Sequence, residues 1–343
     1  MPGEFETGPI RPPSEADSLL IRLTRNCPWN RCKFCGLYKQ ERFSARSVDE
    51  IKEDIDQIAA FRGGILGEKA SVFLQDANSI VLSYDKLCRI LSYIREKLPN
   101  VNRVTSYGRV DSLAKFSSEQ LAGLKDAGLD RVHSGFESGS DKVLTLINKG
   151  YTKAQEIEAG QKVKGSGIEL SVYFMPGVGG RELSEENATE TADVISKANP
   201  DFVRIRTFVS QPGTELMADI ENGLMTECTD MEKMLELKRM IEAIEGADGH
   251  LFSDHIINLH ENVQGSLADN KEKMLAVFQA FESLEEADRK RYQIARRGAM
   301  VRSMDQMELL GSGQMSRIDA YRERLSDDAE FEYFLLDLLR RYI

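Results

Sequence analysis

The sequence predicts an α/β fold in which parallel strands form a partial (β/α)6 barrel, or a fuller parallel barrel, followed by a C-terminal helical appendage. Between Leu19 and Phe208, short apolar runs rich in β-branched residues alternate with amphipathic stretches of helical periodicity. Several of these stretches begin with a capping-box sequence, and glycine stands where they should end. Because parallel strands need helical crossovers, this alternation indicates a parallel sheet covered by helices.

Seven segments have the length and composition of buried strands. Their spacing of about 30–50 residues suits a closed or partly closed barrel, in which functional groups gather after the carboxyl ends of the strands. The segments are Leu19–Thr24, Ser71–Leu74, Arg103–Ser106, Arg131–Ser134, Glu169–Phe174, Phe202–Phe208 and, as the last candidate, His250–Ser253.

Helix boundaries between these strands are marked by local signals. Ser47–Glu50 reads Ser-Val-Asp-Glu, the capping-box pattern, and isoleucines follow it at helical spacing. The same signals recur as capping boxes at Ser117–Gln120 and Thr152–Gln155, and as terminating glycines at Gly128 and Gly167.

The chain is expected to have three parts. Residues 1–17 are predicted to be a flexible leader, residues 18–220 the barrel, and residues 221–343 a mainly helical extension over the substrate side. Helices are expected in the extension at Met225–Ala247, Lys271–Leu284 and Ser316–Tyr342.

Composition limits the class of protein. Hydrophobic residues make up 41% and charged residues 29%, as in ordinary globular proteins. No run approaches the ~18 apolar residues of a membrane span, and the first residues lack a secretory pattern. A cytoplasmic protein is therefore expected. The net charge of −11 disfavours nucleic acid as the main partner.

Three of the five cysteines lie within nine residues, directly after the first predicted strand. In a cytoplasmic protein such clustering indicates a metal site or redox chemistry. Three thiolates can bind three irons of a cubane cluster and leave the fourth iron open. Zinc, which needs a fourth ligand nearby, and inert thiols are the less favoured alternatives. Cys88 and Cys228 are expected not to be ligands. The loop cysteines are Cys27, Cys32 and Cys35.

This loop resembles the cysteine loop of radical S-adenosylmethionine (radical SAM) enzymes, with an aromatic residue, Phe34, before the last cysteine and Gly36 after it. Four residues separate Cys27 from Cys32, where the usual spacing is three, which leaves the subfamily open. The resemblance covers about residues 18–220 and is to the branch of anaerobic coproporphyrinogen oxidase and the methylthiotransferases.

The resemblance implies cofactors and partners. It implies a [4Fe–4S] cluster on the three loop cysteines, S-adenosylmethionine (SAM), oxygen sensitivity and an electron donor such as flavodoxin or ferredoxin. It also places Phe34 among the cofactor-binding residues. At the end of the second predicted strand, Gln75, Asp76 and Asn78 are expected near the methionyl amino group of SAM. Asn78 is equally suited to cap the following helix.

Two further strand ends carry candidate cofactor residues. Ser106 and Arg109 are expected to face the pocket, and Arg109 has the planar fork that suits the methionyl carboxylate. A surface ion pair with Asp111 is the alternative for Arg109. Glu137 and Ser138 lie in a Gly-Phe-Glu-Ser-Gly stretch that resembles a family motif, which implies contacts with the sugar or amino group of SAM.

The last candidates lie on the fifth and sixth strands and in the extension. Tyr173 precedes a glycine-rich turn and is expected beside adenine. Arg204 and Arg206 share one face of a strand, and an inward face would require an anion. Asp254 and His255 are weak candidates for an acid/base pair, with a structural hydrogen bond as the alternative.

The expected function is reductive cleavage of SAM and hydrogen-atom abstraction from a small, anionic substrate. Radical modification of a peptide or RNA, and a non-catalytic iron–sulfur redox or sensor protein, are the alternatives. A second cysteine set is absent from the sequence, which disfavours methylthiotransfer. The identity of the substrate and the reaction after hydrogen abstraction are not determined by the sequence.

Overall fold

The computed structural model describes residues 6–62, 70–325 and 327–342. The chain divides into two compact units, and each is described by itself. Unit 1 comprises residues up to Phe136 together with Lys149–Val172 and Lys197–Asp201. Unit 2 comprises Glu137–Asn148, Tyr173–Ser196 and Phe202 onward. No helix among the described residues is both long enough and apolar enough to cross a membrane.

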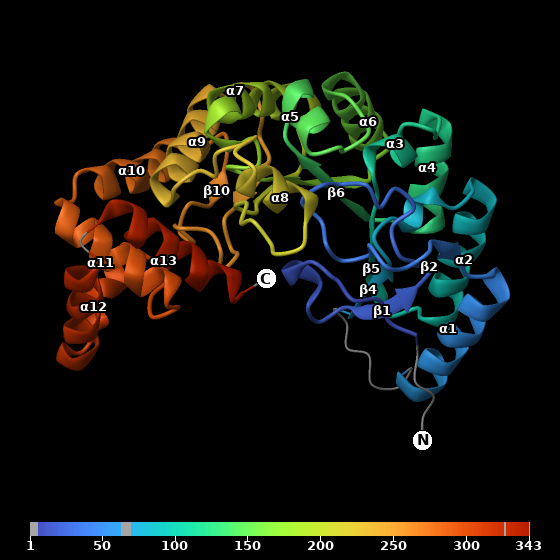
Figure 1. Cartoon of the computed structure of the whole chain (residues 1–343). Coiled ribbons are helices and arrows are strands. Elements are labelled where there is room, and N and C mark those ends of the chain that lie inside the picture. The colour runs from blue at the N-terminus through green and yellow to red at the C-terminus, as the bar shows by residue number, and fades with distance from the viewer. Residues whose placement is uncertain (1–5, 63–69, 326, 343) are drawn as a thin grey trace. The chain divides into compact units, whose positions relative to one another are not determined.

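The main sheet has eight strands, nearly all parallel, in the order β1-β4-β5-β6-β7-β8-β9-β10. Strands β1, β4, β5 and β6 of this sheet are labelled in Figure 1. Among the described residues the two end strands do not pair, so the sheet is open, and the α/β prediction of a partial barrel is confirmed. The strands are β1 Leu19–Arg22, β4 Ala70–Gln75, β5 Val101–Tyr107, β6 Arg131–Glu137, β7 Glu169–Phe174, β8 Phe202–Ile205, β9 His250–Phe252 and β10 Gly265–Ser266.

In unit 1 the parallel register brings the carboxyl ends of β1 and β4 to one edge, where Arg22 lies opposite Gln75. β4 pairs in parallel with β5, and β5 with β6. The consecutive residues Val72, Phe73 and Leu74 are fully buried. A continuous apolar run is typical of a parallel strand covered on both faces, and it anchors this edge of the sheet.

Three helices of unit 1 begin at the predicted capping boxes. Ser47 and Glu50 exchange side-chain and backbone hydrogen bonds in a capping box, and the other two capping boxes also form. Gly128 ends a helix with φ +116°, a conformation that glycine adopts without strain. The elements are η1 Pro13–Glu15, α1 Val48–Arg62, η2 Ser79–Val81, α2 Tyr84–Lys97, α3 Val110–Leu113, α4 Ser118–Ala127 and α6 Lys153–Gly165, with a hairpin of β2 Thr24–Arg25 and β3 Ser44–Ala45.

In unit 2, β8 pairs in parallel with β9, and β9 pairs antiparallel with β10. The sheet therefore continues beyond residue 220, where the sequence predicted that the barrel ends. The helices are α5 Asp141–Leu146, α7 Gly180–Ala198, α8 Glu215–Glu221, α9 Asp230–Ala243, α10 Lys271–Glu282, α11 Glu286–Arg297, η3 Met304–Leu309, α12 Ser312–Arg324 and α13 Asp328–Arg340.

Two features of the C-terminal helices differ from the predicted ones. The segment Ser316–Tyr342, expected as one helix, contains parts of α12 and α13, and Asp327 caps the second of these. Helix α11 was not predicted, because its sequence is dominated by charge. It is nevertheless buried, since Arg297 forms a bidentate ion pair with Asp230 (2.8 and 2.6 Å) and Arg296 donates to backbone carbonyls.

Candidate functional site

The three loop cysteines of unit 1 lie between the short strands β2 and β3. Cys32 is buried, and Cys27 and Cys35 are partly exposed. The Cys35 N–H donates to the Cys32 carbonyl (3.3 Å), and the Asn30 N–H points to Cys27 Sγ (3.4 Å). Asn26 (φ +68°) and Asn30 (φ +47°) take left-handed conformations, which asparagine tolerates better than most residues. The loop is thus tightly folded around the thiols.

The donor set fits a cubane cluster. Burial raises the pKa of the Cys35 thiol, and charge on Cys32 and Cys27 raises it further, so the sulfurs lie within electrostatic reach of one another. Among the described residues, no three His, Cys, Asp or Glu side chains converge to hold a single metal ion. A cubane cluster does not require such convergence, because each thiolate binds a different iron.

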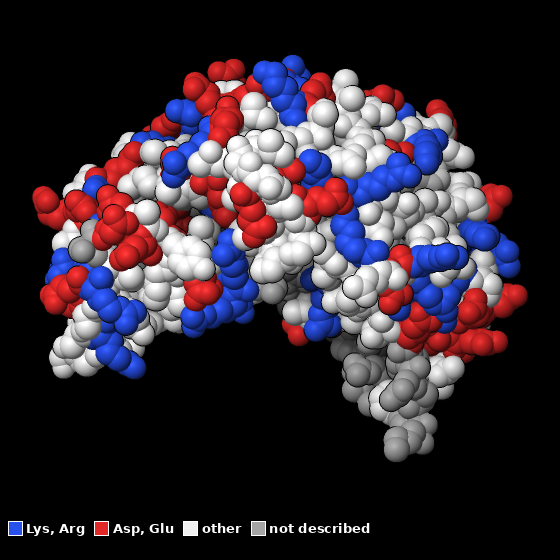
Figure 2. Space-filling model, in the orientation of Figure 1, with Lys and Arg blue, Asp and Glu red and all other residues white. Residues whose placement is uncertain are grey.

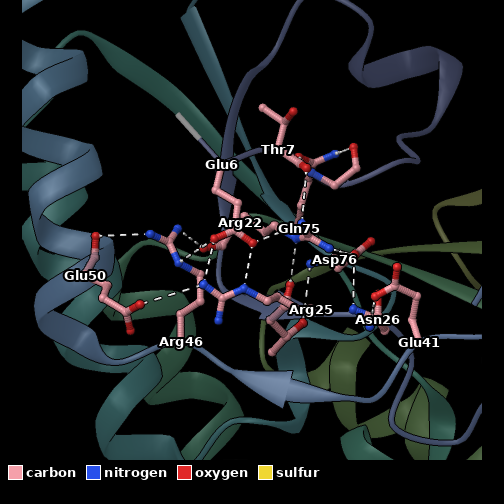
Figure 3. A network of polar contacts seen from close by, with 12 residues as sticks. Glu6, Thr7, Arg22, Arg25, Asn26, Glu41, Arg46, Glu50, Gln75 and Asp76 are labelled. Carbon is pink, nitrogen blue, oxygen red and sulfur yellow. Dashed lines mark hydrogen bonds and ion pairs between the residues drawn. The ribbon is translucent and has the colours of Figure 1, made fainter. Parts of the chain in front are cut away.

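Asp76 follows β4, is fully buried and holds both ends of the cysteine loop. Its Oδ2 accepts from the Asn26 N–H (3.2 Å) and from Arg22 Nη2 (2.9 Å) (Figure 3). Its Oδ1 accepts from the Tyr38 hydroxyl (2.5 Å). Asn26 directly precedes the first loop cysteine, and Tyr38 lies three residues after the last. One carboxylate therefore fixes both the entrance and the exit of the loop.

These contacts also determine the protonation state of Tyr38. Burial raises the pKa of Tyr38, and the hydrogen bond to Asp76 raises it further, so the hydroxyl stays protonated and acts as a donor. Both oxygens of Asp76 are engaged by protein groups. The expected contact between Asp76 and the methionyl amino group stays a prediction.

Residues 6–10 lie across the end of β4 (Figure 3), where the sequence predicted a flexible leader. The Gln75 amide accepts from the Gly8 N–H (2.9 Å) and donates to the Gly8 carbonyl (3.3 Å). The Glu6 carboxylate accepts two hydrogen bonds from Arg25 (2.7 Å each). Gln75 holds this stretch by satisfying its backbone groups, and the expected contact of Gln75 with the cofactor stays a prediction.

Asn78 and Ser106 are fully buried, and protein groups satisfy them. Asn78 Oδ1 accepts from the Arg109 N–H (3.1 Å), and its Nδ2 donates to Ser112 Oγ (2.8 Å). Asn78 makes no capping bond to η2, so the helix-cap alternative is not realised. The Ser106 hydroxyl lies 3.1 Å from a carbonyl of its own strand. Both residues join the ends of β4 and β5, and their contact with a cofactor stays a prediction.

Arg109 is buried against the cysteine loop. Its Nε donates to Asp111 (2.9 Å), as the surface-pair alternative required, but its guanidinium also lies 5.3 Å from the centre of the Trp29 ring. Burial alone would lower the pKa of Arg109, yet a neighbouring tyrosine, Asp111 and the loop thiols raise it above its usual value. Phe34 lies beneath the ammonium group of Lys149 (5.5 Å to the ring centre). Cations and rings thus surround the thiols.

Unit 2 holds the other candidates. Glu137 ends β6 with φ +65° and is 9% exposed. Its carbonyl accepts from the Met175 N–H (2.9 Å), and the Ser138 hydroxyl accepts from the Ser140 N–H (3.0 Å). A left-handed backbone at a buried glutamate is uncommon and is found most often at functional sites. The backbone therefore supports a functional reading of Glu137.

Tyr173, Arg204 and Arg206 are neighbours in unit 2. Burial raises the pKa of Tyr173 to about 12, while the charges of Arg204 and Arg206 act against this rise. Arg204 is 6% exposed, and an oxygen of Asp254 lies 3.5 Å from its Nη1. Arg206 donates to His255 Nε2 (2.8 Å). Both arginines act on Tyr173, which agrees with the prediction that they share one face of the strand.

The acid/base pair expected from the adjacency of Asp254 and His255 does not form in unit 2. Asp254 turns to Arg204, and His255 turns to Arg206. Burial lowers the pKa of His255 to about 4, and the charge of Arg206 lowers it further. His255 is therefore neutral at pH 7 and accepts at Nε2. The two neighbours in sequence therefore face different arginines.

Sequence reasoning missed two residues of the loop surroundings, Tyr38 and Lys149. Both lie in segments that carry family-like sequence, but neither has a residue type that by itself indicates a role in the site. Their positions become clear from the contacts with Asp76 and Phe34.

Two curated proteins illustrate the sequence relationships. An uncharacterized methyltransferase of Pyrococcus horikoshii is 26% identical over 227 residues, covering 64% of this chain and 47% of that protein. A tRNA-2-methylthio-N(6)-dimethylallyladenosine synthase of Aquifex aeolicus is 25% identical over 230 residues, covering 64% and 50%. The chain spans about half the length of these relatives.

Among solved structures, coproporphyrinogen III oxidase of Escherichia coli has a similar fold, with a TM-score of 0.50 and 15% identity over 66% of this chain and 51% of that one. The Radical SAM superfamily model matches residues 21–192, from β1 to α7 and including the cysteine loop. This match covers half of the chain and confirms the resemblance drawn from the loop. The chain therefore belongs to the radical SAM superfamily, enzymes that use a [4Fe–4S] cluster and SAM.

Proposed function

We propose that Cys27, Cys32 and Cys35 hold the [4Fe–4S] cluster of this enzyme, and that the enzyme abstracts a hydrogen atom from a small anionic substrate. The observation that carries the proposal is the cysteine loop itself, whose two ends are fixed by one buried carboxylate. When bound, the cluster provides the electron with which enzymes of this superfamily cleave SAM to a 5′-deoxyadenosyl radical.

The residues of the chain supply position and charge. Asp76 holds the loop in one conformation, so that the thiols are placed before the cluster binds. Arg109 brings a guanidinium next to the loop, where it suits the carboxylate of the methionyl group. Glu137 and Ser138 are proposed to contact SAM through the sugar or the amino group.

The proposed substrate is anionic because of Arg204 and Arg206. Arg204 is buried, and Arg206 follows it two residues later on the same predicted strand face. Two guanidinium groups on one face favour an anion. A polyanion is a poorer fit, because the net charge is −11 and basic and acidic side chains are interspersed on the face shown in Figure 2.

A second candidate is the modification of RNA, since a relative at 25% identity is named for a tRNA modification. The two candidates differ in partner. The small-molecule proposal predicts no tRNA binding near physiological salt, and measurable binding there would refute it.

The cluster assignment is tested by iron content and SAM cleavage. Cys32→Ala should lose iron after anaerobic reconstitution, whereas Cys88→Ala should retain it, because Cys88 lies in helix α2 and is expected to be a packing residue. The unsubstituted protein, given dithionite and SAM, should release 5′-deoxyadenosine slowly. Iron loss in Cys88→Ala, or no 5′-deoxyadenosine from the cluster-loaded protein, would contradict the proposal. The second result would favour a redox or sensor protein.

A further inference from the structure

Lys149 is a buried cation beside the cysteine loop of unit 1. Lys149 as a whole is 6% exposed to solvent. The ammonium group lies 5.5 Å from the centre of the Phe34 ring and 5.9 Å from that of Tyr151, and Phe34 directly precedes Cys35. A buried ammonium group loses its hydration, and such a position is favourable only where negative charge or the faces of aromatic rings compensate.

The turn that carries Lys149 is packed against the same loop. Gly150 has φ +86°, and a Cβ atom there would clash with the Trp29 ring. The Tyr151 hydroxyl donates to a backbone carbonyl of β6, and Arg109 Nη2 donates to the Lys149 carbonyl (2.8 Å). These contacts fix the backbone at Lys149 and at the two residues after it, so its side chain starts from a defined place beside the loop.

The charge of Lys149 is close to the segment that carries Cys35, because its ammonium group lies over the ring of Phe34, the residue directly before Cys35. Arg109 is a second cation near the loop, and its guanidinium also lies over Tyr151 (5.4 Å). Arg109 has Asp111 as a counter-ion at 2.9 Å. Two cations thus share one aromatic side chain next to three thiols.

A cubane cluster on three thiolates is negatively charged, and reduction by one electron adds a further negative charge. A nearby fixed cation favours the more negative state by Coulomb attraction, most strongly where water is excluded. We infer that Lys149 sets the reduction potential of the cluster, because its ammonium group compensates the charge gained when a low-potential one-electron donor reduces it. This rests on the proposed ligation by the loop cysteines. Lys149 acts through charge and touches no reacting atom.

Three substitutions separate this role from packing. Lys149→Met removes the charge and keeps an unbranched apolar side chain, and Lys149→Arg keeps the charge. Lys39→Met is the matched control, because it removes a charge from an exposed residue close to the same loop. Each protein is reconstituted anaerobically, its iron is counted, and its midpoint potential is measured without SAM by a redox titration followed by electron paramagnetic resonance.

Lys149→Met should keep its iron but have a lower midpoint potential. At a fixed potential the ratio of reduced to oxidised cluster should fall at least tenfold, which equals 59 mV for one electron. Lys149→Arg and Lys39→Met should behave as the unsubstituted protein. An unchanged potential in Lys149→Met would overturn the inference. So would loss of iron from Lys149→Met alone, since Lys149 would then be structural. Failure of the unsubstituted protein to bind iron would overturn the proposed function, and the inference with it.

Discussion

Replacing Asp76 by asparagine should loosen the cysteine loop at both ends. The carboxylate is fully buried and accepts from Arg22 (2.9 Å), Asn26 (3.2 Å) and Tyr38 (2.5 Å). Asparagine keeps the shape but offers one acceptor oxygen and no charge. If that oxygen faces Arg22 and Asn26, the new NH2 group meets the Tyr38 hydroxyl, whose hydrogen must turn away so that its oxygen accepts. All three contacts are weakened by one substitution.

The magnitude follows from these contacts. A charge-assisted hydrogen bond exceeds a neutral one by about 1 kcal/mol, so three contacts amount to about 3 kcal/mol. Breaking a buried ion pair usually costs more, ~3–5 kcal/mol, because one charge is left without a partner. We expect the smaller cost here, because Arg22 still has the Glu6 carboxylate as a counter-ion at 3.0 Å. A difference of about 3 kcal/mol corresponds to a roughly hundredfold change in an equilibrium constant.

Two assays measure the effect. Urea unfolding of the cluster-free protein, followed by circular dichroism, should show a lower midpoint for Asp76→Asn. A chelator should strip iron from the reconstituted variant up to about a hundredfold faster, if iron leaves through local opening of the loop. Asp328→Asn is the control, since its side chain is 84% exposed and pairs with Lys290 on the surface. This substitution should cost at most about 0.5 kcal/mol. Unchanged stability and iron retention in Asp76→Asn would refute the conclusion that Asp76 fixes both ends of the cysteine loop.

Two further predictions concern Glu137 and Glu15. Glu137→Gln should fold and keep its iron yet bind SAM at least tenfold more weakly by calorimetry; precipitation or iron loss would show a structural role. Burial acts to raise the pKa of Glu15, but hydrogen bonds from His133 and Ser18 outweigh it and lower the pKa to about 2. Stability should therefore fall as pH drops from about 4.5 to about 2, and Glu15→Gln should flatten that dependence in urea titrations. An identical pH profile in the variant would contradict this.

The sequence by itself determined the parts of the fold that depend on local signals. Strand β7 lies at its predicted limits, and the capping boxes at Ser47, Ser117 and Thr152 all form. Apolar periodicity and capping involve residues a few positions apart, so they can be recognised without knowledge of the fold. The cysteine spacing is local in the same sense, which is why the family could be recognised from one loop.

Only the tertiary structure decided which partner each polar side chain takes. Asp76 meets Asn26 and Tyr38 because β4 follows β1 in the sheet, and no feature near Asp76 in the sequence announces either contact. Arg297, in a helix that the sequence did not predict, is buried and pairs with Asp230. The physical reason is that apolar residues are buried almost regardless of partner, whereas a buried charge is stable only with a specific counter-group, whose approach is set by the packing of distant elements.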